Sequence, residues 1–406
     1  RRPVPPNTAA RREAPAQGAV TGPAQGAVTS AGAVGQRNAG AVTGVGRVPE
    51  LTGVRALAAI LVLATHAAYT TGKYTHGYLG VVYSRMEIGV PIFFVLSGFL
   101  LFGPWVRAAA AGAPPPSLRR YARHRVRRIM PPYVVTVLAA YLIYHFRDAG
   151  PNPGHSWGGL LRNLTLTQIY TDSYLYSHLH QGLTQMWSLA VEVAFYVALP
   201  VLAFLLLAVL CRRRWRPGLL LAGLGGVALI SPAWMVLVHT TDFLPDGAPL
   251  WLPGYLAWFV GGMVLAVLAA VGVRVYWFIA IPLAVVCYFI VSTPIAGEPT
   301  TSPTGLAQAV VKIAFYAVIA TLVVAPLALG NSGAYPRLLG SRPMVWLGEI
   351  SYEIFLVHLI VMELTMVEIL HWRVYTGSMP VLFIVTLALT IPVAWVLHRF
   401  TRVRTI

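Results

Sequence analysis

The sequence predicts an all-α polytopic membrane protein of about ten transmembrane helices with both termini in the cytosol. Of its 406 residues, 57% are hydrophobic and only 11% are charged, and the mean hydropathy is +0.68. Apolar runs of roughly 17 to 25 residues, long enough to cross a bilayer as helices, follow one another along the chain. Their approximate ranges are 51–70, 88–106, 130–147, 184–208, 218–239, 252–271, 273–293, 309–329, 350–369 and 378–398.

The distribution of Lys and Arg assigns the two sides of the membrane. With the N-terminus in the cytosol, 23 basic residues fall on the cytosolic side and 5 on the opposite side, whereas Arg55 and Lys312 lie within spans. Because cytosolic loops carry the excess of Lys and Arg, we expect a bacterial plasma-membrane protein with both termini inside. The formal charge of +17 then reflects orientation and contact with anionic headgroups of the lipid bilayer, and not binding of nucleic acid.

Three segments are predicted along the chain. Residues 1–49 contain six arginines and no aromatic residue and are rich in Ala, Gly, Val and Pro, which is typical of a disordered basic cytosolic tail. Residues 50–399 form the membrane domain, and residues 400–406 form a short cytosolic tail. Only Cys211 and Cys287 occur, so no disulfide framework is expected. The scarcity of Lys relative to Arg suggests a GC-rich actinobacterial genome.

The first span carries two ionisable residues, Arg55 near its start and His66 near its end. At about 100° per residue, the step between them returns to within about 20° of the same helix face, about 16 Å further along the axis. Ionisable groups inside a span usually face the bundle interior and mark a pathway or a reacting site. Alternatively, Arg55 could extend to the headgroups and His66 could be a packing residue.

The fourth span places Ser188 and Glu192 one turn apart on one face, in the outer half of the membrane. His66 lies at a similar depth in the first span. A neutral imidazole paired with a carboxylate can accept a proton from a hydroxyl, while the carboxylate fixes the tautomer of the ring. We therefore expect His66 and Glu192 to act as a pair, either in catalysis or as a structural buried contact.

Two further segments carry candidate residues. Arg125 and Arg128, just before the third span, are three residues apart, so on a helix they could hold phosphate oxygens together. The alternative is that they only orient the chain and bind anionic lipid. In the ninth span, His358 follows Ser351 by seven residues and lies near mid-membrane, where it could act in the site or bond to a neighbouring helix. The sequence has no GxSxG, HExxH, P-loop or paired CxxC motif, so no nucleophilic serine and no metal are expected.

Five motifs occur in order along the chain. They are Arg55 and His66 separated by ten residues, GVPIFFVLSGFLLF from Gly89 to Phe102, Arg125-x-x-Arg128 followed by Pro131, WSLAVEVAFY from Trp187 to Tyr196, and ISYEIFLVH from Ile350 to His358. Together they resemble the acyltransferase 3 family over about residues 51–399. The resemblance implies a ten-helix membrane enzyme that moves an acyl group, commonly acetyl, from cytosolic acyl-CoA to a hydroxyl of a glycan, glycolipid or secondary metabolite.

The resemblance also implies roles for individual residues. By position, His66 is the catalytic histidine, Arg55 is its motif partner, and Ser188 with Glu192 form a second catalytic pair. No metal is implied, and the donor is acetyl-CoA or another acyl-CoA. Within the family, length and composition are most similar to those of mycobacterial members that O-acetylate trehalose monomycolate, a cell-envelope glycolipid. The remaining candidates are Arg125 and Arg128 for the CoA donor and Trp187, Tyr352 and His358 for a further site.

A proton-coupled lipid or solute transporter without acyl transfer is the alternative function. Its proton relay would consist of intramembrane ionisable side chains. The sequence shows no clear inverted repeats or matched broken helices, which disfavours a transporter. Consumption of acetyl-CoA in step with modification of an acceptor distinguishes the two functions. The relay residues would be His66, Glu192, His358 and Glu363.

Overall fold

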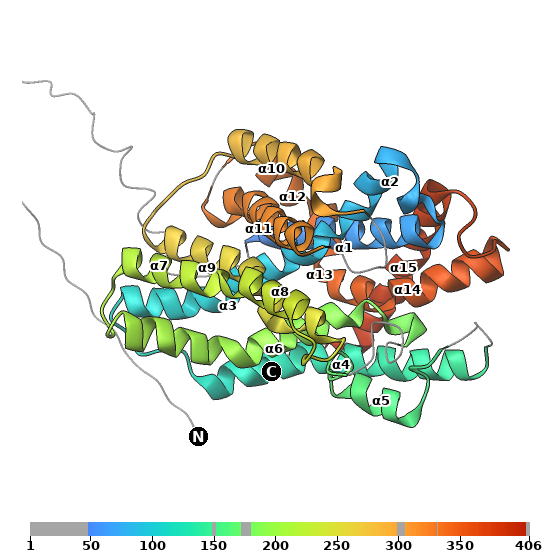
Figure 1. The fold of residues 1–406 in the computed structure, drawn as a ribbon, viewed down its shortest axis with the longest axis horizontal. Coiled ribbons are helices and arrows are strands. Elements are labelled where there is room, and N and C mark those ends of the chain that lie inside the picture. Colours follow the sequence, from blue (N-terminus) through green and yellow to red (C-terminus); the bar gives the residue numbers. More distant parts are fainter. Residues whose placement is uncertain (1–47, 148–151, 172–179, 299–304, 331, 403–406) are drawn as a thin grey trace, which may run out of the picture. The chain divides into compact units, whose positions relative to one another are not determined.

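The computed structural model describes residues 48–147, 152–171, 180–298, 305–330 and 332–402, and all regular structure in these ranges is helical (Figure 1). Nearly all of the predicted basic tail lies outside the described residues. The helices are α1 (Pro49–Thr70), α2 (Gly77–Ser84), α3 (Gly89–Ala110), α4 (Leu118–His145), α5 (Trp157–Leu164), α6 (Met186–Ala203), α7 (Pro217–Ala228), α8 (Ile230–Thr240), α9 (Leu256–Ala270), α10 (Trp277–Val291), α11 (Leu306–Ala328), α12 (Ala334–Leu339), α13 (Arg342–Glu349), α14 (Ser351–Leu364) and α15 (Met379–Thr401).

Proline and glycine mark many of the helix ends. Proline lies in the first turn of α1, α7, α13 and α15, where its fixed φ suits the helix and no backbone N–H is needed. Gly112 and Gly272 follow the ends of α3 and α9 with φ of 64° and 78°, a conformation that side chains with a Cβ adopt rarely. The apolar runs of the sequence therefore become helices with defined ends.

Eight helical segments in the described part of the chain are long and apolar enough to cross a membrane, or nine if one bent pair counts as a span. The sequence predicted ten. The run 273–293 forms only the 15-residue helix α10, because extended backbone follows the end of α9. At 1.5 Å per residue, α10 is about 22 Å long, short of a hydrocarbon core of about 30 Å.

The ninth predicted run forms one arm of the bent pair. α13 and the helical segment Ser351–Ile369 meet at an angle of 69°, with Ile350 between them. The described chain thus has eight or nine candidate spans where the sequence predicted about ten, and the cytosolic placement of the termini stays a prediction. The bend separates α14, which carries His358, from the short helix that precedes it.

Helix α1 is enclosed by its neighbours and contacts α3, α13, α14, α15 and the short helix η2 (Arg85–Ile88). Glycines permit this close approach, because a Cβ at Gly89 would collide with the Ala58 carbonyl and one at Gly348 with the Thr52 carbonyl. Small residues serve the same purpose in other membrane bundles, where packing rather than hydrophobicity drives helix association. Arg55 and His66 consequently contact protein.

Helix α3 packs along α9 through a second pair of glycines. A Cβ at Gly98 would collide with the Phe259 carbonyl, and one at Gly262 would collide with the Val95 carbonyl. The ring of Phe259 stacks on that of Phe94, with ring centroids 4.3 Å apart. This interface fixes α3, which contributes more residues to the pocket described below than any other helix.

Candidate functional site

Two histidines meet inside the bundle, His66 from α1 and His358 from α14. The Nε2 atom of His358 lies 3.1 Å from Nδ1 of His66, and the ring centroids are 5.0 Å apart. His358 is buried, whereas His66 is only half-buried. The contact joins two helices that the sequence separates by 292 residues.

The hydrogen bonds of this pair assign the tautomers of both rings. Nδ1 of His358 lies 2.7 Å from the Phe355 carbonyl oxygen, and Nδ1 of His66 lies 2.8 Å from the Val62 carbonyl oxygen. A carbonyl only accepts, so each neutral ring carries its proton on Nδ1. Nε2 of His66 then has a lone pair and no hydrogen-bond partner among the described residues. This nitrogen can accept a proton from a substrate hydroxyl.

Glu192 bonds elsewhere, so the structure corrects the predicted pairing of His66 with Glu192. Oε1 of Glu192 accepts hydrogen bonds from the Ser97 hydroxyl and, at 2.6 Å, from the Tyr196 hydroxyl. Similar depth along two helices does not determine which faces meet. Here α6 packs on α3, whereas α1 packs on α14, and the partner of His66 is therefore His358.

A pocket of about 830 Å³, counting its mouth, lies between α1, α3, α4, α6 and α14. Its charged residues are three arginines, Arg55, Arg125 and Arg128, and one carboxylate, that of Glu192. Within the described chain, none of the three arginines has a carboxylate within 4 Å. The Nε atom of Arg125 is buried without a hydrogen-bond partner among the same residues. Unsatisfied guanidinium donors in excess over carboxylates suit an anionic ligand such as a phosphate.

The pocket extends along α3 towards the histidine pair. Its lining on this helix runs from Val90 to Leu101, about 16 Å at 1.5 Å per residue. Phe93 and Phe355 lie in the lining with ring centroids 6.4 Å apart, and the Phe355 ring lies 5.9 Å from that of His358. His66 itself does not line the pocket. One aromatic residue thus connects the pocket to the histidine pair.

The other predicted residues divide between the pocket and the surrounding core. Ser188 lines the pocket and its hydroxyl donates to the Gln185 carbonyl at 3.2 Å. Tyr352 also lines it, with its hydroxyl donating to the Ile129 carbonyl at 3.1 Å. Trp187 is outside the lining and packs against Tyr255 with ring centroids 5.2 Å apart.

Two residues of the pocket were missed by sequence reasoning. Ser97 is the hydroxyl donor to Glu192, and it is the one hydroxyl-bearing residue within the apolar run 89–102, which is a signal that could have identified it. Tyr196, one turn after Glu192, was seen only as part of a motif. Their contacts hold the carboxylate of Glu192 within the pocket.

Together these observations define a helical membrane protein with an arginine-lined pocket that ends beside a histidine pair. Residues 48–399 match the acyltransferase 3 family, described as an acyltransferase domain, and the chain belongs to this family. The acyltransferase MdmB of Streptomyces mycarofaciens is 29% identical over 332 residues, which cover 78% of this chain and 79% of that protein. No solved structure matches the chain significantly.

Two further relatives are longer than this chain. The peptidoglycan O-acetyltransferase OatA of Listeria monocytogenes is 28% identical over 78% of this chain and 50% of that protein. The O-acetyltransferase OatA of Staphylococcus aureus is 24% identical over 87% of this chain and 56% of that protein. The matched region is therefore about half of each OatA protein.

Proposed function

We propose that this protein transfers an acyl group, acetyl in its main reaction, from cytosolic acyl-CoA to a hydroxyl of a cell-envelope glycolipid or glycan. The observation that carries the proposal is the pocket with three arginines that reaches, through Phe355, a histidine pair with one free ring nitrogen. The relatives that are named O-acetyltransferases support acetyl as the transferred group and a hydroxyl as its acceptor.

For the donor, the pocket offers a charged end and an apolar end. Arg125 and Arg128 would bind the phosphates of CoA, and Arg55 would add positive charge further along. The acyl thioester arm would then lie along the α3 side of the pocket, towards Phe93 and Phe355. A charged nucleotide can in this way remain at one end while the thioester reaches the histidine pair.

In the proposed reaction, Nε2 of His66 accepts the proton of the acceptor hydroxyl while the hydroxyl oxygen attacks the thioester carbonyl carbon. The carbon–sulfur bond breaks, and the CoA thiolate takes a proton from the imidazolium as it leaves. His358 accepts the hydrogen bond from Nδ1–H and so orients the ring. In an alternative route, Nε2 attacks the thioester, the carbon–sulfur bond breaks with release of the CoA thiolate, and the acceptor hydroxyl then takes the acyl group from the acyl-histidine. Trapping of label on the protein without acceptor tests this route.

For the specific acceptor we propose trehalose monomycolate, on the basis of length and composition. The named substrate of the Listeria relative, peptidoglycan, makes a glycan the second candidate. A proton-relaying transporter is less compatible with the site, because Glu192 bonds to Ser97 and Tyr196 and Glu363 bonds to Tyr144. Neither carboxylate joins the histidine pair among the described contacts.

The test uses the purified protein with labelled acetyl-CoA and extracted envelope glycolipids. Wild-type protein should consume acetyl-CoA in proportion to the lipid that gains an acetyl group, as measured by mass spectrometry. His66→Ala should reduce transfer by at least 100-fold, as expected for loss of a general base. Normal transfer by this variant, or lipid movement without acetyl-CoA consumption, would contradict the proposal.

A further inference from the structure

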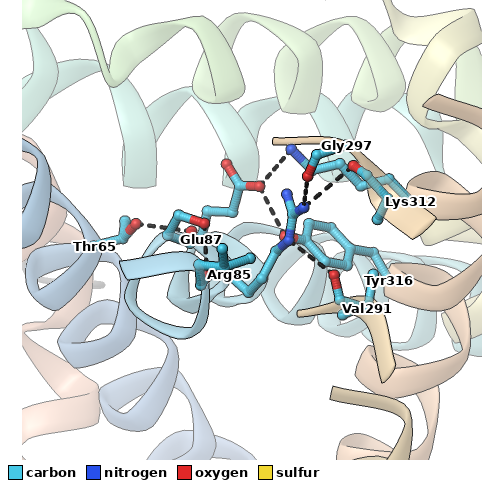
Figure 2. A network of polar contacts seen from close by, with 10 residues as sticks. Thr65, Arg85, Glu87, Val291, Gly297, Lys312 and Tyr316 are labelled. Atoms are coloured by element: carbon cyan, nitrogen blue, oxygen red, sulfur yellow. Dashed lines mark hydrogen bonds and ion pairs between the residues drawn. The ribbon is translucent and has the colours of Figure 1, made fainter. Parts of the chain in front are cut away.

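A second charged cluster lies beside the C-terminal half of α1 and has no role in the reaction just described (Figure 2). Arg85 in η2 is 2% exposed. Its guanidinium donates to the carbonyls of Val291 at 3.0 Å, Ala296 at 3.2 Å and Gly297 at 2.5 Å. Carbonyls at the end of a helix carry partial negative charge, so they suit this cation. Arg85 therefore fixes η2, and with it Glu87, against the end of α10.

Glu87 is held by one of its two carboxylate oxygens. Oε1 accepts from Nζ of Lys312 at 2.6 Å and from the hydroxyl of Tyr316 at 2.8 Å, both on α11. Oε2 has no partner among the described residues, and Figure 2 shows it pointing away from both donors. The side chains of Glu87 and Lys312 are 41% and 29% exposed. One oxygen of the carboxylate is therefore free to accept a hydrogen bond.

This pair differs from a closed structural ion pair. Glu87 and Lys312 both belong to candidate membrane spans, where ionisable residues are costly and usually functional. By comparison, Glu353 pairs with His398 at 2.9 Å, and the Glu353 side chain is only 8% exposed. A pair that only joined helices would be expected to be enclosed in this way. The open geometry of Glu87 points to a ligand.

The pair lies close to both parts of the proposed site. Thr65, next to His66, donates to the Ser84 carbonyl at 3.0 Å, which joins α1 to the turn that carries Glu87. Val90, less than one turn after Glu87, already lines the donor pocket. Glu87 consequently lies where the acceptor and the acyl thioester would meet.

We propose that Glu87 and Lys312 form an acceptor subsite that binds a second hydroxyl of a saccharide while the reacting hydroxyl lies at Nε2 of His66. Oε2 of Glu87 accepts the hydrogen bond of that second hydroxyl, and Nζ of Lys312 donates to a sugar oxygen. The inference rests on the proposed function and adds the acceptor class. An alcohol with a single hydroxyl gains nothing from the subsite, which makes the proposal testable.

The experiment measures acetyl transfer by purified protein in nanodiscs to trehalose, to N-acetylglucosamine and to ethanol. In Glu87→Gln, Lys312 and Tyr316 would retain the amide oxygen, so the amide N–H₂ would face the acceptor where an oxygen is needed. We expect kcat/KM for the preferred sugar to fall roughly 10- to 100-fold, the effect of losing a hydrogen bond to a charged group. Transfer to ethanol and hydrolysis of acetyl-CoA should stay within about twofold of wild type.

Two variants control for folding and for charge. Glu87→Gln/Lys312→Met removes both charges, so no uncompensated ion remains, and it should show the same selective loss for sugars. Glu368→Gln removes a carboxylate that pairs with Arg147 at the surface and should leave all rates unchanged. Equal rates for sugar and ethanol in wild type, or a variant that loses both equally, would overturn the subsite.

Binding is measured separately by saturation-transfer NMR of each sugar on donor-free protein. The signal of the preferred sugar should be strong with wild type and Glu368→Gln and absent with Glu87→Gln. Equal signals from all three proteins, or no sugar signal with wild type, would overturn the subsite whatever the enzyme does with acetyl-CoA. A wild-type protein that binds sugar but consumes no acetyl-CoA would instead refute the proposed function alone.

Discussion

At the scale of single residues, the backbone decides which nitrogen of His66 can react. The Val62 carbonyl and Nε2 of His358 both lie against Nδ1 of His66, and both accept hydrogen bonds in the assigned tautomers. The proton therefore stays on Nδ1, and Nε2 keeps its lone pair. His358 is in turn fixed by the Phe355 carbonyl, and the Phe355 side chain lines the pocket. The orientation of the base is thus coupled to the wall of the donor pocket.

Replacing His358 should lower the rate of transfer without weakening donor binding. His358→Ala removes one of the two acceptors for Nδ1–H of His66 and the ring packed beside it, so only the Val62 carbonyl holds the His66 ring and its orientation is less well fixed. We expect kcat to fall about 10- to 100-fold and KM for acetyl-CoA to change less than about twofold. Steady-state kinetics of His358→Ala, with the wild type and His66→Ala as references, measures the change in kcat and KM. An unchanged kcat would show that His358 does not position His66.

The arginines of α4 allow a matched test of donor binding. Arg125 and Arg128 line the pocket, whereas Arg127 on the same helix does not. Arg125→Ala and Arg128→Ala should each raise KM for acetyl-CoA about tenfold, the effect of losing about 1.4 kcal/mol of interaction. Arg127→Ala should leave it unchanged. If all three variants raise KM equally, the cluster acts only through its overall charge.

At the scale of elements, close backbone contacts set the position of α3 and hence of the pocket. Ser97, which bonds Glu192, directly precedes Gly98, the residue against the Phe259 carbonyl of α9. Glycine at this position lets the two helix backbones approach each other. A change on the α9 side of α3 should therefore disturb the Ser97–Glu192 contact on the pocket side.

Gly98→Ala tests the close packing on which this coupling depends. The added methyl would collide with the Phe259 carbonyl, so the helices must separate, and we expect a loss of about 1–3 kcal/mol of stability. Gly225→Ala is the matched control, because its Cβ would meet nothing within 4 Å. Thermal unfolding of both variants in detergent, followed by tryptophan fluorescence, gives the comparison. Equal Tm values would contradict the packing argument.

A histidine cluster outside the spans predicts a pH-sensitive element. His180 is buried next to His155, with Nε2 and Nδ1 3.2 Å apart, and Tyr141 and Tyr144 also pack on its ring. Burial, together with the neighbouring His155, lowers the pKa of His180 to about 4. In the unfolded segment its pKa would be about 6.5. Opening therefore takes up a proton between these values, and stability must fall as the pH falls.

Hydrogen exchange can measure this loss directly. The N–H of Gly182 donates to Nδ1 of His180 at 3.3 Å, so protonation of that nitrogen breaks the bond. Below pH 6.5, the free energy of opening measured at the Gly182 amide should fall by about 1.4 kcal/mol per pH unit, after correction for intrinsic exchange. His180→Gln should remove most of this dependence. A pH-independent opening energy in the wild-type protein would contradict the prediction.

At the scale of the whole molecule, sequence reasoning predicted the helical membrane fold but not every contact in it. Apolar runs gave the helices, because length and hydropathy are local properties. The 15-residue α10 and the bend at Ile350 depend on where neighbouring backbones end, which an apolar run does not record. The His66–His358 contact likewise depends on which helices are neighbours, and depth alone favoured Glu192 instead.

The orientation of the molecule in the membrane determines from which side each substrate enters. Arg125 and Arg128 are near the start of α4 and Arg55 near the start of α1, whereas His66 is towards the other end of α1. The excess of basic residues predicts that the arginine end faces the cytosol, where acyl-CoA is made. Single cysteines at Arg123 and Gly158, in a Cys211→Ser/Cys287→Ser background, test this with a membrane-impermeant maleimide. In intact cells the maleimide should label the cysteine at 158, and it should label the one at 123 only after the membrane is permeabilised. The reverse pattern would place the arginine end of the pocket outside the cell and contradict the prediction.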